Sequence, residues 1–282
     1  MTECGVCFRH CKLREGQIGF CGGRIARGGR TEAYHYGRIS SLALDPIEKK
    51  PLNRFFPGSR ILSVGSFGCN LRCPFCQNHE ISWSEEAKRF ALTAQTASPE
   101  ELVSIAKETR SRGNIGVAFT YNEPLIGYEF VRDTAKRLKA DGMKAVMVTN
   151  GTAGLAVWDE LKPYIDAMNI DLKGFTDRYY EQVLGGNRRQ VLAFIEAAVK
   201  TCHVELTTLI VPGENDGEEE MRALSQWVSR LQNPDGTGVP LHISRFFPRF
   251  HMQDRSATPV RTVYRLADVA REELAFVYTG NC

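Results

Sequence analysis

The chain has 282 residues, a net charge of +3 and a hydrophobic share of 43%. This length suits one barrel-sized domain with a small appendage, and no basic run indicates nucleic acid. No stretch is apolar for the length of a membrane span, and the N-terminal residues lack the apolar core of a signal peptide. We therefore expect a soluble, cytoplasmic protein without nucleic-acid or membrane partners.

Seven of the nine cysteines fall into two tight groups with the spacing of metal ligands. This usage indicates a reducing compartment rather than the disulfides of a secreted chain. We expect the isolated Cys202 to be a buried, inert thiol and Cys282 to lie in a frayed terminus.

The first cysteine group lies in residues 1–30, on glycine-rich turns with few apolar residues to bury. Its spacing is C-x2-C-x3-C-x9-C, formed by Cys4, Cys7, Cys11 and Cys21. Such a segment predicts a small lobe folded around a metal. We expect a closed structural site for zinc or a single iron. An auxiliary iron–sulfur cluster and free thiols are the alternatives.

Residues 31–60 predict a hairpin followed by a proline-rich connecting segment. Residues 31–36 and 39–44 have strand-like patterns around Gly37, and two prolines follow in residues 45–51. The charges of this second part fit a solvated loop. If the loop borders the second cysteine group, Lys49 or Lys50 could meet an anionic ligand.

From residue 61 onward, strand-like and helix-like stretches alternate. The expected strands are 61–66, 116–120, 144–149, 167–172, 204–211, 241–246 and 276–278, and the expected helices are 99–112, 126–140, 155–164, 177–184 with 190–201, 217–231 and 260–273. This alternation predicts right-handed crossovers and a parallel sheet. No glycine-rich dinucleotide fingerprint follows a strand. We therefore expect an α/β fold with a partial, open parallel β/α barrel over residues 61–282.

The second cysteine group directly follows the first of these strands. Cys69, Cys73 and Cys76 form the pattern C-x3-C-x2-C. Three thiolates at a strand exit can hold three irons of a cubane cluster and leave the fourth iron open for chemistry, whereas a structural zinc site has four protein ligands. A zinc knuckle completed by His79 is the alternative.

Polar residues gather at the C-terminal ends of the expected strands, which share one mouth in a parallel barrel. They include Glu123, Thr149, Asn150, Asp171, Lys173, Thr207, His242 and Ser244. Each residue alone has a structural explanation, such as an ion pair or a turn. Their joint placement beside the cysteine triplet predicts an active site.

Seven segments, in order along nearly the full chain, carry a resemblance to a known family. They are the four-cysteine lobe, LALDPIEKKPL (42–52), the triplet with Phe75 before its third cysteine, TYNEP (120–124), VTNG (148–151), NIDLKG (169–174) and SRFFP (244–248). Together they resemble the radical S-adenosylmethionine (SAM) component of the AmmeMemoRadiSam system, a group similar to pyruvate formate-lyase activating enzymes.

The resemblance implies a [4Fe-4S] cluster held by Cys69, Cys73 and Cys76, with SAM on the open iron. Reductive cleavage of SAM would give a 5'-deoxyadenosyl radical that abstracts hydrogen from a substrate, a protein glycine in the activating enzymes. An electron donor such as flavodoxin or ferredoxin is also implied. The alternative is a non-catalytic iron–sulfur electron carrier or a metal-stabilised interaction module.

The resemblance also implies how SAM is bound. Glu123 stands at the acidic end of a Gly-Gly-Glu motif that receives the SAM amino group, although Tyr121 and Asn122 replace the glycines. Asp171 and Lys173 match an Asp-x-Lys element beside SAM.

Three further residues bear on this implied site. Thr149 and Asn150 would offer hydroxyl and amide contacts to SAM, and His242 would approach the adenine or ribose. The activating enzymes often use an acidic residue before the matching Thr to hold a monovalent cation. Here that residue is Val148, so a cation site is not expected.

Overall fold

An eight-stranded sheet forms the centre of the fold, described for residues 1–282 in a computed structural model. The strand order is β14-β13-β12-β11-β10-β9-β7-β6, and only β6 runs antiparallel to its neighbour. The strands are β6 (Ser41–Pro46), β7 (Arg60–Gly65), β9 (Asn114–Phe119), β10 (Lys144–Thr149), β11 (Ala167–Asp171), β12 (His203–Ile210), β13 (Leu241–Arg245) and β14 (Val277–Gly280). The predicted α/β fold is confirmed, and the free edges β6 and β14 agree with an open barrel.

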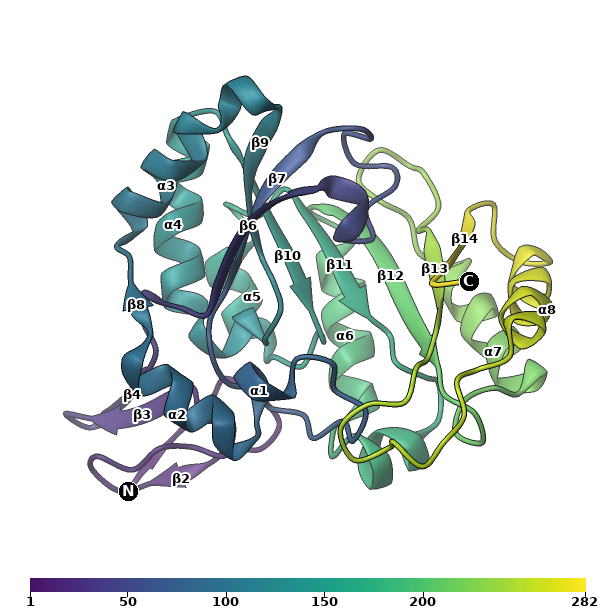
Figure 1. The fold of residues 1–282 in the computed structure, drawn as a ribbon, viewed down its shortest axis with the longest axis horizontal. Coiled ribbons are helices and arrows are strands. Elements are labelled where there is room, and N and C mark those ends of the chain that lie inside the picture. The colour runs from purple at the N-terminus through teal and green to yellow at the C-terminus, as the bar shows by residue number, and fades with distance from the viewer.

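Helices cover one face of the sheet (Figure 1). They are α3 (Pro99–Glu108), α4 (Tyr128–Ala140), α5 (Leu155–Leu161), α6 (Arg188–Ala198), α7 (Glu218–Val228) and α8 (Val260–Arg271), with the 3-10 turns η2 (Arg110–Arg112) and η3 (Pro124–Gly127) and the π-helical turn η4 (Tyr179–Val183). Helical spacing explains the packing, since α4 buries Phe130, Val131, Ala135 and Leu138 on one side. No helix has the length and apolar character needed to span a bilayer.

The segment that joins β6 to β7 crosses the other face of the sheet, where η1 (Ile47–Lys49) lies in front of the strands in Figure 1. Its Pro51 carbonyl accepts a hydrogen bond from the Asn169 side chain on β11. The N–H groups of Asn53 and Arg54 donate to the Glu205 carboxylate on β12. Residues 47–54, here called the crossing segment, therefore cover the interior of the barrel on the side away from the C-terminal ends of the strands.

The predicted hairpin around Gly37 is wrong. Instead, β3 (Arg24–Arg27) pairs with β4 (Arg30–Ala33) around Gly28 and Gly29. Both glycines have positive φ, at 56° and 76°, as a two-residue type I′ turn requires. The strand pattern after Gly37 divides between β5 (Arg38–Ile39), which pairs with β8 (Gln95–Thr96), and β6 of the main sheet. The border expected at residue 30 therefore falls within a hairpin.

The N-terminal residues, through the β3–β4 hairpin, form a small lobe at the end of the sheet where the parallel strands finish (Figure 1). Besides β3, it contains β1 (Thr2–Glu3) paired with β2 (Lys12–Leu13). Two helices that the sequence did not indicate, α1 (His79–Ser82) and α2 (Glu85–Thr93), follow the cysteine triplet.

Candidate active site

The candidate active site is an open cavity of ≈ 370 Å³ at the C-terminal ends of the parallel strands. The structure brings most of the sequence-predicted residues to its walls, namely Cys69, Cys73, Cys76, Glu123, Thr149, Asn150, Asp171 and Lys173. They come from the loops and ends that follow β7, β9, β10 and β11. In parallel β/α folds this edge is where ligands bind.

The loop after β7, residues 68–78, carries the cysteine triplet and is called the cluster loop below. Burial raises the pKa of all three thiols, to about 12 for Cys73, although the nearby Lys173 ammonium opposes the shift at Cys73 and Cys76. Without a cation the thiols are neutral at pH 7. Iron supplies the positive charge that turns such thiols into thiolate ligands.

His79 does not complete a four-ligand zinc site at the triplet. No group of three or more His, Cys, Asp or Glu side chains is placed to hold one metal ion. In a cubane each thiolate binds its own iron, so its ligands need not converge on a single point. His79, the fourth ligand of the zinc alternative, instead stacks on Phe250 with ring centroids 4.2 Å apart.

Glu123 is buried beside the cluster loop and accepts three hydrogen bonds. Its donors are the Thr149 hydroxyl at 2.6 Å, the Asn150 N–H at 2.8 Å and the Leu125 N–H at 2.9 Å. Burial nevertheless raises the pKa of the Glu123 carboxyl to about 7. A carboxylate in this position suits an amino group, which restores the charge balance and donates N–H.

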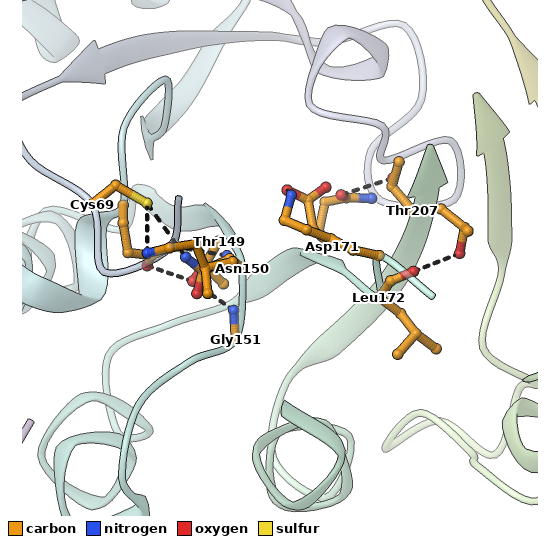
Figure 2. Close-up of polar contacts among 12 residues, drawn as sticks. Cys69, Thr149, Asn150, Gly151, Asp171, Leu172 and Thr207 are labelled. Carbon is orange, nitrogen blue, oxygen red and sulfur yellow. Dashed lines mark hydrogen bonds and ion pairs between the residues drawn. The ribbon is translucent and has the colours of Figure 1, made fainter. Parts of the chain in front are cut away.

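Asn150 connects Glu123 to the cluster loop. Its side-chain Nδ2 lies 3.7 Å from the Cys69 sulfur and 3.0 Å from Asn70 Oδ1. Figure 2 shows Cys69, Thr149 and Asn150 gathered on one side and Asp171 and Thr207 on the other. Asn70, which sequence reasoning missed, is fully buried and donates to the Thr152 carbonyl at 2.7 Å. The sequence signal that could have identified Asn70 is its position directly after Cys69, a proposed cluster ligand.

Asp171 and Lys173 form an ion pair with 2.8 Å between carboxylate and ammonium. Burial would lower the pKa of Lys173, but the Asp171 carboxylate and, once ionised, the Cys73 sulfur hold it well above its ordinary value. The Lys173 N–H donates to the Tyr180 hydroxyl of η4 at 3.1 Å. The ion pair carries no net charge, and it fixes the Lys173 ammonium close to the triplet.

The side chains of Tyr121 and Asn122, which stand at the two glycine positions of the motif, make no hydrogen bond to the Glu123 carboxylate. Tyr121, at φ +72°, donates its hydroxyl to Asp45 at 3.0 Å. Its ring lies against Gly65, where any Cβ would fall 3.0 Å from the ring. Asn122 accepts from the Ser66 N–H and donates to the Gly68 carbonyl. Both side chains therefore bind β6, β7 and the cluster loop.

Lys49 and Lys50 also reach the cavity wall. Both pair with Asp45, at 3.4 Å and 3.0 Å. Lys50 is buried by this contact, whereas the Lys49 side chain is 67% exposed. Two ammonium groups share one carboxylate here, so this wall keeps a net positive charge beside the cavity.

His242 does not reach the cavity. It lies near the start of β13, donates its Nε2–H to the Glu205 carboxylate at 2.7 Å and stacks on Tyr278. Glu205 also contacts His203 at 3.0 Å and receives the two N–H groups of the crossing segment. These contacts make the His242–Glu205 pair part of the barrel interior.

Glu205→Gln is expected to lower the free energy of unfolding by about 2 kcal/mol, because an amide cannot accept from all the buried donors. Although burial opposes it, hydrogen bonds from His203, His242 and Arg54 lower the pKa of Glu205 to about 2. The carboxylate therefore stabilises the fold above about pH 4.5, and this contribution is lost as the pH falls towards 2. Urea unfolding of both proteins from pH 7 to 3 checks this; a constant difference would contradict it.

The first cysteine group lies together in the lobe. Cys4, Cys7, Cys11 and Cys21 line one small cavity, and none forms a disulfide. Their thiols do not converge around one point, so a single ion would have to draw them inward. Four cysteine sulfurs around one cavity are soft ligands that fit zinc, iron or an iron–sulfur cluster.

An open parallel barrel with thiols and a polar cavity at its strand ends defines a cofactor-dependent enzyme. The chain belongs to the radical SAM superfamily, whose model matches residues 63–224. This family implies a [4Fe-4S] cluster and SAM-cleaving radical chemistry. The triplet, Glu123 and the Asp171–Lys173 pair fit these two groups chemically.

Relatives extend the likeness beyond the family region. An uncharacterized protein of Methanocaldococcus jannaschii is 38% identical over 99% of this chain and 81% of its own length. Pyruvate formate-lyase 1-activating enzyme of Escherichia coli is 27% identical over 63% of this chain and 71% of its own length. The chain is thus homologous to activating enzymes.

Solved structures agree on the fold. SuiB of Streptococcus suis bound to S-adenosylmethionine has a TM-score of 0.59 at 12% identity, covering 79% of this chain and 52% of SuiB. QueE of Escherichia coli has a TM-score of 0.53 at 13% identity, covering 86% of this chain and 92% of QueE.

Proposed function

We propose that this protein is the radical SAM component of the AmmeMemoRadiSam system and acts in a reducing compartment, the cytoplasm. It would cleave SAM reductively and abstract hydrogen from a substrate, with a protein glycine as the leading candidate because activating enzymes are among its relatives. When bound to Cys69, Cys73 and Cys76, the cluster supplies the electron that cleaves SAM into methionine and a 5'-deoxyadenosyl radical. An electron donor such as flavodoxin or ferredoxin would supply that electron.

One observation carries the proposal: the cluster loop and the proposed SAM ligands belong to a single contact network. Cys69 contacts Asn150, whose N–H donates to Glu123, which also accepts from Thr149. In this network Glu123 would receive the SAM amino group, and Lys173 would neutralise the SAM carboxylate while Asp171 fixes the lysine. An electron carrier needs no such set of ligands beside its cluster, and membership of an enzyme family decides against that alternative.

Residues 1–30, 31–60 and 61–282 would then serve as a metal-binding lobe, a connecting segment and the catalytic barrel. Ser41–Pro46 of the connecting segment also contributes the edge strand of the sheet. The lobe would hold zinc or a second iron site on Cys4, Cys7, Cys11 and Cys21.

The proposal is tested by anaerobic reconstitution of the cluster followed by dithionite and SAM. Chromatography should then detect 5'-deoxyadenosine in proportion to the loaded protein. Intact cluster and SAM binding without this product would refute the radical function.

The glycine substrate needs a separate experiment. Candidate partner proteins are added to the same mixture, and electron paramagnetic resonance (EPR) is used to look for the doublet of a glycyl radical. Formation of 5'-deoxyadenosine with no protein radical in any partner would leave SAM cleavage standing and reject the glycine.

A further inference from the structure

The N-terminal lobe and the cluster loop are joined directly through their cysteine segments. The Cys69 N–H donates to the Cys21 carbonyl at 3.0 Å. Gly68, at φ +94°, lies so close to the lobe that a Cβ there would fall 2.6 Å from the Cys21 oxygen. A metal ligand proposed for one site therefore hydrogen-bonds, through its backbone, to a ligand proposed for the other.

Two arginines reinforce this contact from opposite sides. Arg72, in the cluster loop, donates to the Phe20 carbonyl of the lobe at 2.5 Å and to the Cys69 carbonyl at 2.9 Å. Arg9, in the lobe, donates to the Asn70 carbonyl of the cluster loop at 3.0 Å and also to Gly185.

The guanidinium groups of Arg9 and Arg72 both lie over the ring of Phe20, at 3.5 Å and 3.7 Å from its centroid. Two like charges packed on one ring repel each other, so the arrangement persists only while the carbonyl groups that they bind stay in place. The stack therefore depends on the conformation of the lobe.

Asn70 extends the connection to the SAM site. Its backbone carbonyl accepts a hydrogen bond from Arg9 of the lobe, and its side-chain Oδ1 accepts one from the Asn150 amide at 3.0 Å. Asn150 in turn contacts Cys69 and Glu123. Asn70 therefore connects the lobe, by hydrogen bonds, to the residues around the cluster loop.

Resting on the proposed function, we infer that the N-terminal lobe is the positioning element of the cluster loop, and that its thiol-bound metal controls assembly of the [4Fe-4S] cluster. Arg9, Asn70 and Arg72 are positioning residues that act through the triplet. With few apolar residues of its own, the lobe needs its metal to hold Phe20 and Cys21 where the loop can bind them. Metal loading of the lobe is then a precondition for radical chemistry.

The test measures the cluster itself in the full chain. We expect Cys7→Ser to lose the lobe metal and the Arg9→Ala/Arg72→Ala double variant to keep it. Both should bind the cluster about 10-fold more weakly, as is typical when outer-shell support is removed. Retained iron and sulfide under a chelator challenge give the affinity, and the EPR spectrum of the reduced cluster reports its environment. The matched control is Arg14→Ala, an exposed lobe residue, which should behave as the wild type.

The lobe metal is identified separately by elemental analysis of a variant in which all three cluster cysteines are alanine. Wild-type cluster retention and EPR spectrum in Cys7→Ser overturn the inference. If circular dichroism shows that Cys7→Ser is unfolded, the double variant decides. Wild-type cluster retention and a wild-type EPR spectrum in the double variant then overturn the inference. Failure of the proposed function looks different, because wild-type protein would then produce no 5'-deoxyadenosine while these variants could still lose the cluster.

Discussion

Cys73→Ala is expected to reduce SAM cleavage to the level of a mixture without protein. Cys73 is the middle ligand of the triplet and is buried at the cavity wall near Lys173. Its loss leaves two thiols, too few to hold the site-differentiated cluster that the proposed reaction requires. Anaerobic assay of 5'-deoxyadenosine, with iron and sulfide content, provides the measurement.

Cys202→Ala is the matched control. Cys202 is also buried, at 3% exposure, but its thiol packs in the core away from the cavity and hydrogen-bonds only to the Ala198 carbonyl at the end of α6. We expect full cluster content and full SAM cleavage in this variant. Comparable losses of cluster and of SAM cleavage in both variants would indicate that removing any buried thiol impairs the protein. Activity in Cys73→Ala would exclude the triplet as the cluster ligands.

Glu123→Gln is expected to weaken SAM binding by about 10- to 100-fold, the worth of a charge-assisted hydrogen bond. It should also change the pH dependence. Burial raises the pKa of Glu123 to about 7, so below this pH the carboxyl must lose a proton before it can accept from an amino group. The affinity of the wild type should therefore increase as the pH rises to about 7 and then level off.

Equilibrium dialysis of the cluster-loaded protein with SAM between pH 5.5 and 7.5 measures this effect. In Glu123→Gln the increase should disappear. Glu108→Gln, at the exposed end of α3, is the control and should keep the wild-type profile. The same pH profile in Glu123→Gln as in the wild type would assign the titration to another group.

Most of the barrel could be predicted because strand and helix patterns alternate clearly after residue 60. Lys144–Thr149 was predicted to the residue, since an apolar run ends at a turn formed by Asn150 and Gly151. The hairpin was placed around Gly37 because the strands that actually pair, β3 and β4, are short and rich in polar residues. The adjacent glycines Gly28 and Gly29 were the turn signal that would have located it. Helix α1 is only four residues long, and α2 buries no side chain larger than Ala87 and Ala91, so neither helix was recognised from an apolar face.

The depth of the cavity could not be predicted. His242 and Ser244 face the same side of β13, but only Ser244 lines the cavity. The two residues differ by about 7 Å along the strand. Where the cavity ends depends on the crossing segment, which reaches β11 and β12 through tertiary contacts that no local pattern encodes.

The crossing segment has a consequence for the shape of the enzyme. An open sheet with two free edges has no neighbouring strand to fix its curvature, so contacts across its concave face must do so. Lys50 holds one end to Asp45 on β6, while Glu205 and Asn169 hold the other end to β12 and β11. The spacing between the Glu123 wall and the Thr207 wall is thereby set by a segment that supplies none of the proposed cluster ligands. Substitutions in this segment would alter which substrates fit without touching a single ligand of the cluster.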